Sequence, residues 1–365
     1  MAKVVAKVAE AKPRAPESNR EPKTGLVAEF REAMDRLVER GAPWPGAVAV
    51  SGGADSLALM YLLADWAKAR GKPAPQVLTV DHGLRSGSDK DAEKVAKQAK
   101  QAGLKAHVLV WKGAKPKSDI ESEAREARYR LMGEWLKAHQ TNALYVAHSE
   151  EDQAETFLLR LARGSGLDGL SAMQPLAPFP AAGFEGCRVA RPLLEISRKA
   201  LREWLAAQKH DWIEDPMNDD PKFARVRLRK VLPQLAELGL SATRIADAAS
   251  HLSRAREALD SMTDSLLSRA ARFDGPAVVL DPLRLKTAPR EIGLRALATV
   301  LSRVSGEAYR PRFERLERLF DSILAGTLGG GATLHGCRIG PAPREEAVFG
   351  SATLTIAREK GRSGA

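Results

Sequence analysis

The most informative stretch of the sequence is a short loop of small residues, Ser51-Gly52-Gly53-Ala54-Asp55-Ser56. It follows the apolar run 47–50 and precedes a longer apolar run at 57–63, an order that predicts a strand, a tight turn and a buried helix. Glycines bring backbone N–H groups close to a ligand, and the helix that follows points its positive end at the same place. The loop therefore predicts an anion site.

The chemistry of this loop depends on Asp55. No lysine follows where a Walker loop requires one, whereas Asp55 stands where a loop that holds a polyphosphate can also engage Mg²⁺. The alternative is a tight turn with a helix cap, because Asp55 and Ser56 are both good N-cap residues.

A second reactive group follows the apolar run 144–147 and consists of His148, Asp152 and Glu155. Asp152 and Glu155 lie three residues apart on a predicted helix, so both carboxylates are expected to face one cavity. An imidazole beside carboxylates is typical of proton transfer. The alternative is that His148 only caps the end of a strand.

Cations form two further groups. Glu121, Arg125 and Arg128 share one face of a predicted helix, which indicates either cations for phosphates or a solvated Glu–Arg ladder. The second group is rich in arginine and is either an RNA-phosphate surface or a set of ordinary exposed cations. Its members are Arg225, Arg227, Arg229 and Lys230, with Arg244, Arg254 and Arg256 on later helices.

These residues need elements that hold them together, and the apolar pattern predicts an α/β fold. Strands expected at 47–50, 77–80, 107–110 and 144–147 alternate with helices at 25–40, 57–63, 90–102, 121–138 and 153–163. This alternation favours a parallel sheet with helices on both faces, in a Rossmann-like arrangement. The polar clusters 51–56, 81–85 and 148–152 then converge at the carboxyl ends of the strands, where such sheets bind ligands.

A change of character near residue 217 predicts a second domain. Residues 25–217 form the expected catalytic domain, and residues 218–365 form a mainly helical substrate domain with a small C-terminal β element. Helices are expected within 241–272 and at 289–305 and 312–325, and strands at 332–339 and 352–356. Residues 1–24 are expected to be a disordered basic tail.

Composition limits the class of protein. A chain of 365 residues with 44% hydrophobic residues can bury more than one core. The net charge of +11 indicates a polyanionic partner such as nucleic acid. Apolar runs are broken well before the roughly 20 residues that span a bilayer, and two widely separated cysteines fit neither a paired thiol motif nor a zinc site. A cytoplasmic protein is expected.

The loop 51–56 closely resembles the pyrophosphate loop, Ser-Gly-Gly-x-Asp-Ser, of the N-type ATP pyrophosphatase (PP-loop) superfamily. Within it, further segments resemble the tRNA(Ile)-lysidine synthases. They are Val80 to Arg85, Ile120-Glu121 with Ala124-Arg125 and Arg128-Tyr129, Ala147-His148 with Asp152 to Thr156, Arg163 to Gly166, Arg191 to Leu194, and Asp215-Pro216 with Asn218, Asp220, Phe223, Arg225 and Arg227. Two positions depart from the family pattern, with Glu151 for an aspartate and Val226 for an asparagine.

The resemblance implies a ligase that forms a carbon–nitrogen bond. ATP adenylates C2–O of the wobble cytidine in the CAU anticodon of tRNA(Ile), pyrophosphate leaves, and L-lysine displaces AMP, which changes codon recognition from AUG to AUA. The implied requirements are ATP, Mg²⁺, L-lysine and tRNA(Ile), with a homodimer left open. The implied catalytic residues are Asp55, Arg125, His148, Asp152 and Glu155, with Asp55 also engaging Mg²⁺. ATP binding is implied for Ser51, Gly52, Gly53, Ala54, Asp55, Ser56, Asp81, His82 and Arg128, and tRNA binding for Arg191, Arg225, Arg227, Arg229 and Lys230.

Three other functions compete with this one. A tRNA thiolation enzyme uses the same ATP chemistry but needs paired cysteines, which the sequence lacks. A small-molecule amidating synthetase needs an ammonia source, usually a glutaminase domain, for which the chain has no room. A basic RNA-binding protein that has lost its activity would not need Asp55 and the 148–155 cluster.

Overall fold

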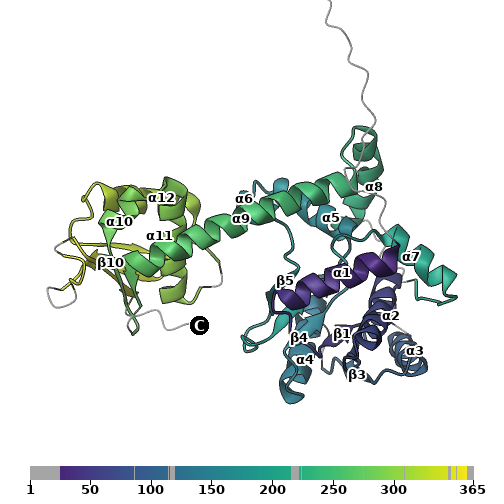
Figure 1. Ribbon diagram of the computed structural model, residues 1–365. Coiled ribbons are helices and arrows are strands. Elements are labelled where there is room, and N and C mark those ends of the chain that lie inside the picture. Colours follow the sequence, from purple (N-terminus) through teal and green to yellow (C-terminus); the bar gives the residue numbers. More distant parts are fainter. Residues whose placement is uncertain are drawn as a thin grey trace, which may run out of the picture. The chain divides into compact units, whose positions relative to one another are not determined.

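The computed structural model describes residues 25–85, 87–113, 115, 120–214, 222, 224–273, 275–307, 309–343, 347–350 and 352–359. The predicted tail at 1–24 and the motif residues 215–221 and 223 lie outside the described residues, as does the side chain of Glu121. The chain divides into two compact units, Met1–Ser253 and Arg254–Ala365 (Figure 1).

The first unit is built on a six-stranded sheet with the strand order β3-β2-β1-β4-β6-β5. All neighbouring strands are parallel except β5, which runs antiparallel to β6. The strands are β1 (Ala47–Ala49), β2 (Gln76–Asp81), β3 (Ala106–Val110), β4 (Ala143–Tyr145), β5 (Leu176–Pro178) and β6 (Arg188–Ala190). The predicted parallel sheet is confirmed. Strands β5 and β6 were not expected, because Pro, Gly and charged residues interrupt the segment around them and, unlike β1 and β4, they do not stand between a clear apolar run and a helix.

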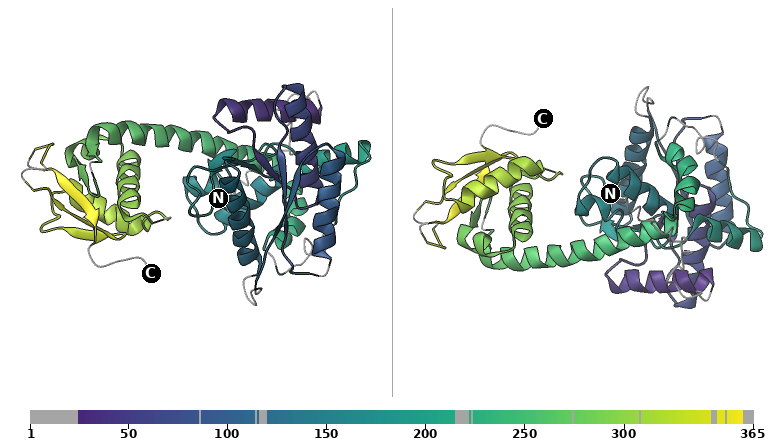
Figure 2. Two further views of the ribbon diagram at one scale, coloured as in Figure 1. Left: turned by 90° about the horizontal axis from the view of Figure 1, so that it is seen from below. Right: turned by 90° about the horizontal axis from the view of Figure 1, so that it is seen from above.

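Helices cover both faces of this sheet (Figures 1 and 2). They are α1 (Leu26–Glu39), α2 (Ala54–Ala69), α3 (Ser88–Gln101), α4 (Ile120–Ala138), α5 (Glu150–Leu161), the short α6 (Leu167–Leu170) and α7 (Arg198–Ala207). Side chains alternate across the pleat, so that Val48 packs into a core with α1, α2, α3 and α7, whereas Ala47 packs into a second core with α4. A hydrophobic core on each face therefore fixes the sheet and the positions of its strand ends.

The first unit continues past the boundary expected near residue 217. Helices α8 (Ala224–Glu237) and the first part of α9 (Ala242–Ala270) belong to it. Here α8 packs against α5, and Thr243 Oγ1 donates to Glu150 Oε1 at 2.8 Å. The functional division at 217 stays a prediction, but the compact unit contains the arginine-rich helix α8.

The second unit holds an antiparallel sheet with the order β7-β8-β11-β10-β9, and α11 packs on β10 and β11 (Figure 2). Its elements are β7 (Ala271–Arg272), β8 (Val278–Leu280), α10 (Pro282–Thr287), α11 (Arg290–Ser305), α12 (Phe313–Leu324), β9 (Ala332–Leu334), β10 (Cys337–Pro341) and β11 (Leu354–Arg358). The single strand expected at 332–339 is a hairpin, since His335 and Gly336 both adopt positive φ, at 55° and 69°, as a tight hairpin turn requires. No helix in the described part of the chain combines the length and apolarity needed to cross a membrane.

Candidate active site

A cavity of about 810 Å³ opens at the carboxyl ends of β1 and β4, which are neighbours in the sheet. The loop after β1 and the start of α5 after β4 both line it. The predicted residues that line it are Ser51, Gly53, Ala54, Asp55, Ser56, Arg125, Arg128, His148, Asp152 and Arg229. Two clusters that lie far apart in the sequence thus share one hollow, as expected for the switch region of an open parallel sheet.

The loop 51–56 is held by its own serines. Ser56 Oγ donates to Gly53 O at 2.9 Å and accepts the N–H of Ser51 at 3.2 Å. Gly52 adopts φ +92°, a conformation that side chains rarely tolerate, and a Cβ there would lie 2.5 Å from Cδ1 of Ile213. The loop is therefore a fixed cradle whose following helix, α2, begins at Ala54.

Asp55 lies in the first turn of α2 and faces the cavity. Burial raises the pKa of its carboxyl, Arg198 opposes that rise, and the Asp152 and Glu151 carboxylates add to it, so that together these neighbours bring the pKa from 3.8 to about 6. The Nε of Arg198 lies 3.3 Å from Asp55 Oδ2. The ion pair with Arg198 therefore favours the charged form of the Asp55 carboxyl, which burial disfavours.

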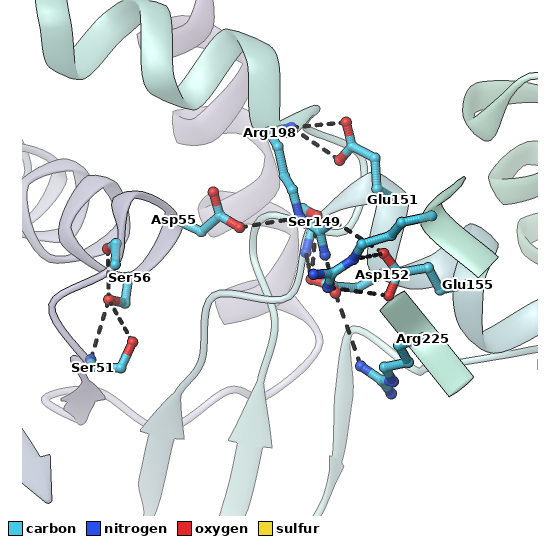
Figure 3. A network of polar contacts seen from close by, with 11 residues as sticks. Ser51, Asp55, Ser56, Ser149, Glu151, Asp152, Glu155, Arg198 and Arg225 are labelled. Atoms are coloured by element: carbon cyan, nitrogen blue, oxygen red, sulfur yellow. Dashed lines mark hydrogen bonds and ion pairs between the residues drawn. The ribbon is translucent and has the colours of Figure 1, made fainter. Parts of the chain in front are cut away.

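Arg198 is the centre of the polar network (Figure 3). It is paired with Asp152 and with Glu155 Oε1, the latter at 3.0 Å, as well as with Asp55. Burial alone would lower the pKa of Arg198, but these three carboxylates raise it above its usual value. One guanidinium therefore joins the loop after β1 to the carboxylates of α5.

Asp152 is fixed at the start of α5. Its Oδ2 accepts the N–H of Ser149, the N-cap residue, at 2.9 Å and the Ser149 hydroxyl at 3.2 Å. These bonds explain why α5 begins at Glu150 rather than near residue 153. Burial alone would raise the pKa of Asp152, but Arg198 and the other neighbours bring it below its usual value.

Glu155 is fully buried and does not line the cavity. Its carboxylate accepts from Arg198 at 3.0 Å and from Nε of Arg229 at 2.7 Å. The expectation that Asp152 and Glu155 face one cavity is corrected, because the two arginines cover Glu155. In this arrangement Glu155 holds the arginines in place.

His148 lies at the end of β4 and lines the cavity. Burial lowers the pKa of its imidazole, Asp152 opposes that shift, and Arg191 and Arg125 add to it, so that the net pKa is about 3. Its buried Nδ1 has no hydrogen-bond partner within the described part of the chain. The ring is therefore neutral at physiological pH.

The remaining predicted nucleotide residues divide into two sets. Arg125 and Arg128 line the cavity, and Arg128 Nη2 lies 3.3 Å from Nε2 of His82. Asp81 and His82 do not line it. Asp81 instead accepts hydrogen bonds from Ser88 Oγ and Gly83 N, which lower its pKa and close the turn after β2.

The predicted tRNA-contacting cations also divide. Arg225 lies 3.9 Å from Asp152 Oδ1, and Arg229 binds Glu155, so both face the carboxylates of α5. Arg227 and Lys230 on the same helix are exposed. Arg191 donates to Gln174 O at 2.8 Å and does not line the cavity.

Sequence reasoning missed Arg198, and the signal for it was present. Ser197 directly precedes it and is the N-cap of α7, accepting the N–H of Ala200 at 3.2 Å. Glu151, the departure from the family pattern, accepts the N–H of Arg198 with both carboxylate oxygens, at 3.1 and 2.9 Å. The longer glutamate thus holds the start of α7. A wall formed by Trp212, Ile213 and Glu214 was not foreseen either.

Most of the chain is similar to proteins of known family. The family model described as a PP-loop domain matches residues 28–235. The tRNA(Ile)-lysidine synthase of Methylobacterium nodulans is 40% identical over 322 residues, which cover 84% of this chain and 92% of that protein. The proteins of the same name from Ruegeria pomeroyi and Wolbachia pipientis wMel are 42% and 38% identical, over 73% and 80% of this chain. The chain spans 62% and 67% of the length of these two relatives.

Proposed function

The chain belongs to the PP-loop family and, within it, to the tRNA(Ile)-lysidine synthases, and from this premise we propose that it ligates L-lysine to the wobble cytidine of tRNA(Ile) with a CAU anticodon. The observation that carries the proposal is the shared cavity, in which the pyrophosphate loop and Asp152 lie on opposite sides of Arg198. The reaction has two steps, and each uses a different side of this cavity.

In the first step the C2 carbonyl oxygen of the cytidine attacks the α-phosphorus of ATP and pyrophosphate leaves. A carbonyl oxygen is a very poor leaving group. Adenylation makes it part of AMP, which is a good leaving group. The N–H groups of the loop 51–56 and the start of α2 suit the phosphates that depart as pyrophosphate. Arg125 and Arg128 line the same cavity and offset the developing charge.

Asp55 suits a magnesium ion that is shared with these phosphates. Within the described residues no group of three acidic, histidine or cysteine side chains could hold a metal by itself. Mg²⁺ is commonly bound by one or two carboxylates together with substrate phosphates, and Asp55 is a cavity-facing carboxylate beside the loop. The ion would supply charge neutralisation for the leaving pyrophosphate.

In the second step the lysine ε-amine attacks C2, a C–N bond forms, and the C2–O bond breaks so that AMP departs. A reference pKa near 10.4 leaves about one amine in a few thousand neutral at pH 7, so a proton must be removed. Asp152 is the cavity carboxylate that suits the ammonium, and Glu155 supports it through the arginines. His148, neutral and with an open Nδ1, is the proposed proton acceptor, and its low pKa would rise when anionic phosphates enter.

The tRNA is proposed to reach the cavity with its anticodon base splayed out of the loop, as is usual for sequence-specific RNA recognition. Arg227 and Lys230 are exposed on α8 and suit backbone phosphates. Arg225 and Arg229, whose side chains face the carboxylates, suit the target nucleotide at the mouth of the cavity. Arg191 is not assigned to this surface, because it does not line the cavity and donates to Gln174 O.

The test combines purified protein with ATP, Mg²⁺, labelled lysine and unmodified tRNA(Ile) with a CAU anticodon. We expect label on the RNA that requires the target cytidine and disappears in Asp55→Ala. Asp65→Ala is the matched control, because Asp65 is exposed on the same helix and does not line the cavity. Release of AMP with another substrate but no lysine transfer would retain the ATP site and reject the lysine assignment, and no turnover of any kind would indicate a binding protein.

A further inference from the structure

We propose that Arg198 is a positioning residue that occupies the carboxylate required by the incoming lysine and leaves it for the phosphates of bound nucleotide. Lysine binding then depends on the presence of nucleotide. This inference rests on the proposed function and deepens it. It assigns a role to a side chain that joins the two halves of the cavity (Figure 3).

The hydrogen-bonding capacity of Asp152 carries the first step. Its Oδ2 already accepts two bonds from Ser149, which is itself fully buried. Its Oδ1 is paired with Arg198, and Arg225 lies 3.9 Å from the same atom. Two guanidiniums already flank Oδ1 and would repel a third cation, so we infer that an ammonium reaching Asp152 from the cavity takes the place of Arg198.

Glu155 offers the ammonium no alternative. Its side chain has no exposed surface, and Oε1 accepts from both Arg198 and Arg229. Asp152 keeps 10% of its side-chain surface exposed and lines the cavity. The amine and Arg198 thus compete for a single carboxylate oxygen.

The other contacts of Arg198 show where it can go. Its Nε lies 3.3 Å from Asp55, beside the loop proposed to hold the phosphates, and its side chain lines the cavity. Its backbone is fixed, because Glu151 accepts its N–H and Ser197 caps α7. Only the side chain needs to turn, and phosphate oxygens match the planar fork of donors on a guanidinium.

The exchange keeps every buried charge compensated. Removing Arg198 from Asp152 without a replacement would leave a buried carboxylate partly unpaired, which is unfavourable. When phosphates attract Arg198, the lysine ammonium replaces it, so one cation substitutes for another. Without nucleotide, an Arg198 side chain that left Asp152 and Glu155 would keep only Asp55 as a partner. Arg198 therefore stays on Asp152, and lysine is excluded from that carboxylate.

The test is calorimetric titration of L-lysine into the full chain, with and without Mg²⁺ and α,β-methylene-ATP. We expect the analogue to tighten lysine binding at least about tenfold in the unaltered protein, within the usual range of coupling between sites. In Arg198→Gln the ratio should fall to about twofold or less, because lysine no longer has a competitor. Arg198→Lys keeps the cation but not the fork and should give an intermediate ratio.

Arg130→Gln is the matched control, since Arg130 forms only an exposed pair with Glu134 at 3.6 Å in the described structure and does not line the cavity. It should keep the full ratio. A folded Arg198→Gln protein with the original ratio would overturn the inference, whereas the proposed function would still stand if the unaltered protein transfers lysine to tRNA. If Arg198→Gln does not fold, an Arg198→Lys ratio equal to that of the control overturns it instead. Absence of both lysine binding and lysine transfer in the unaltered protein would overturn the proposed function as well.

Discussion

Gly52→Ala tests whether the pyrophosphate loop is held in a conformation that only glycine can adopt. The backbone of Gly52 has φ +92°, and an added Cβ would lie 2.5 Å from Cδ1 and 3.3 Å from Cγ1 of Ile213. The left-handed conformation costs about 1–2 kcal/mol for an L-residue. Overpacking adds about 1–3 kcal/mol. The backbone of Ile213 is held, because its N–H donates to Gly52 O at 2.9 Å, so relief of the contact requires its side chain to change rotamer.

The expected loss is therefore about 2–5 kcal/mol, which lowers the melting temperature by roughly 5–20 °C for a unit of this size. Gly53→Ala is the matched comparison. Gly53 has a negative φ, −70°, and a Cβ there would meet only Ser51 Oγ, at 3.8 Å. Because Gly53 lines the cavity, this second variant should keep its melting temperature to within a few degrees while weakening ATP binding.

Differential scanning calorimetry and ATP–pyrophosphate exchange on both variants separate the two effects. The reasoning is refuted if Gly52→Ala melts with the unaltered protein, since the strain and the contact with Ile213 would then be absent. It is equally refuted if Gly53→Ala is the less stable of the pair.

Three further predictions concern charge. Glu155→Gln should cost about 3–5 kcal/mol in thermal unfolding, because it leaves two arginines short of a buried partner, whereas Glu134→Gln in an exposed pair should cost at most about 1 kcal/mol. The pKa of Asp55 is raised from 3.8 to about 6, so folding favours its protonated form and stability falls as pH rises through this window. Asp55→Asn should therefore raise the free energy of unfolding by up to about 3 kcal/mol at pH 7.5 and by less at pH 5, as measured by thermal unfolding. The variant should also lose ATP–pyrophosphate exchange. An equal gain in stability at both pH values would contradict the raised pKa. Arg227→Gln and Lys230→Gln should each weaken tRNA binding and reduce its logarithmic salt dependence by about one unit, and an unchanged slope in filter binding would remove that side chain from the phosphate surface.

Much of the fold was readable from local pattern. The strand, glycine turn and buried helix around Gly52 are encoded within a few neighbouring residues. The turn at His335 and Gly336 is equally local, although the sequence pattern predicted a single strand there. Strand β6 was not predicted, because its conformation depends on pairing with β4, which lies more than 40 residues earlier in the chain. Local pattern is informative where neighbours in sequence determine the conformation, and weak where distant partners do.

By itself, the sequence determined the parallel sheet, the anion loop and the family, because glycine freedom, apolar periodicity and the order of motifs are properties of the chain itself. Only the tertiary structure decided which carboxylate is accessible from the cavity and which cation is paired with it. Arg198 meets Asp152 and Asp55 because α7 packs against α2 and its first residue reaches the start of α5, and Glu155 is covered by the arginines of α7 and α8. The exposure of a side chain and its choice of ion-pair partner are set by the packing of elements distant in sequence. For this reason the sequence could predict neither that Glu155 is covered nor that Arg198 lies at the centre of the site.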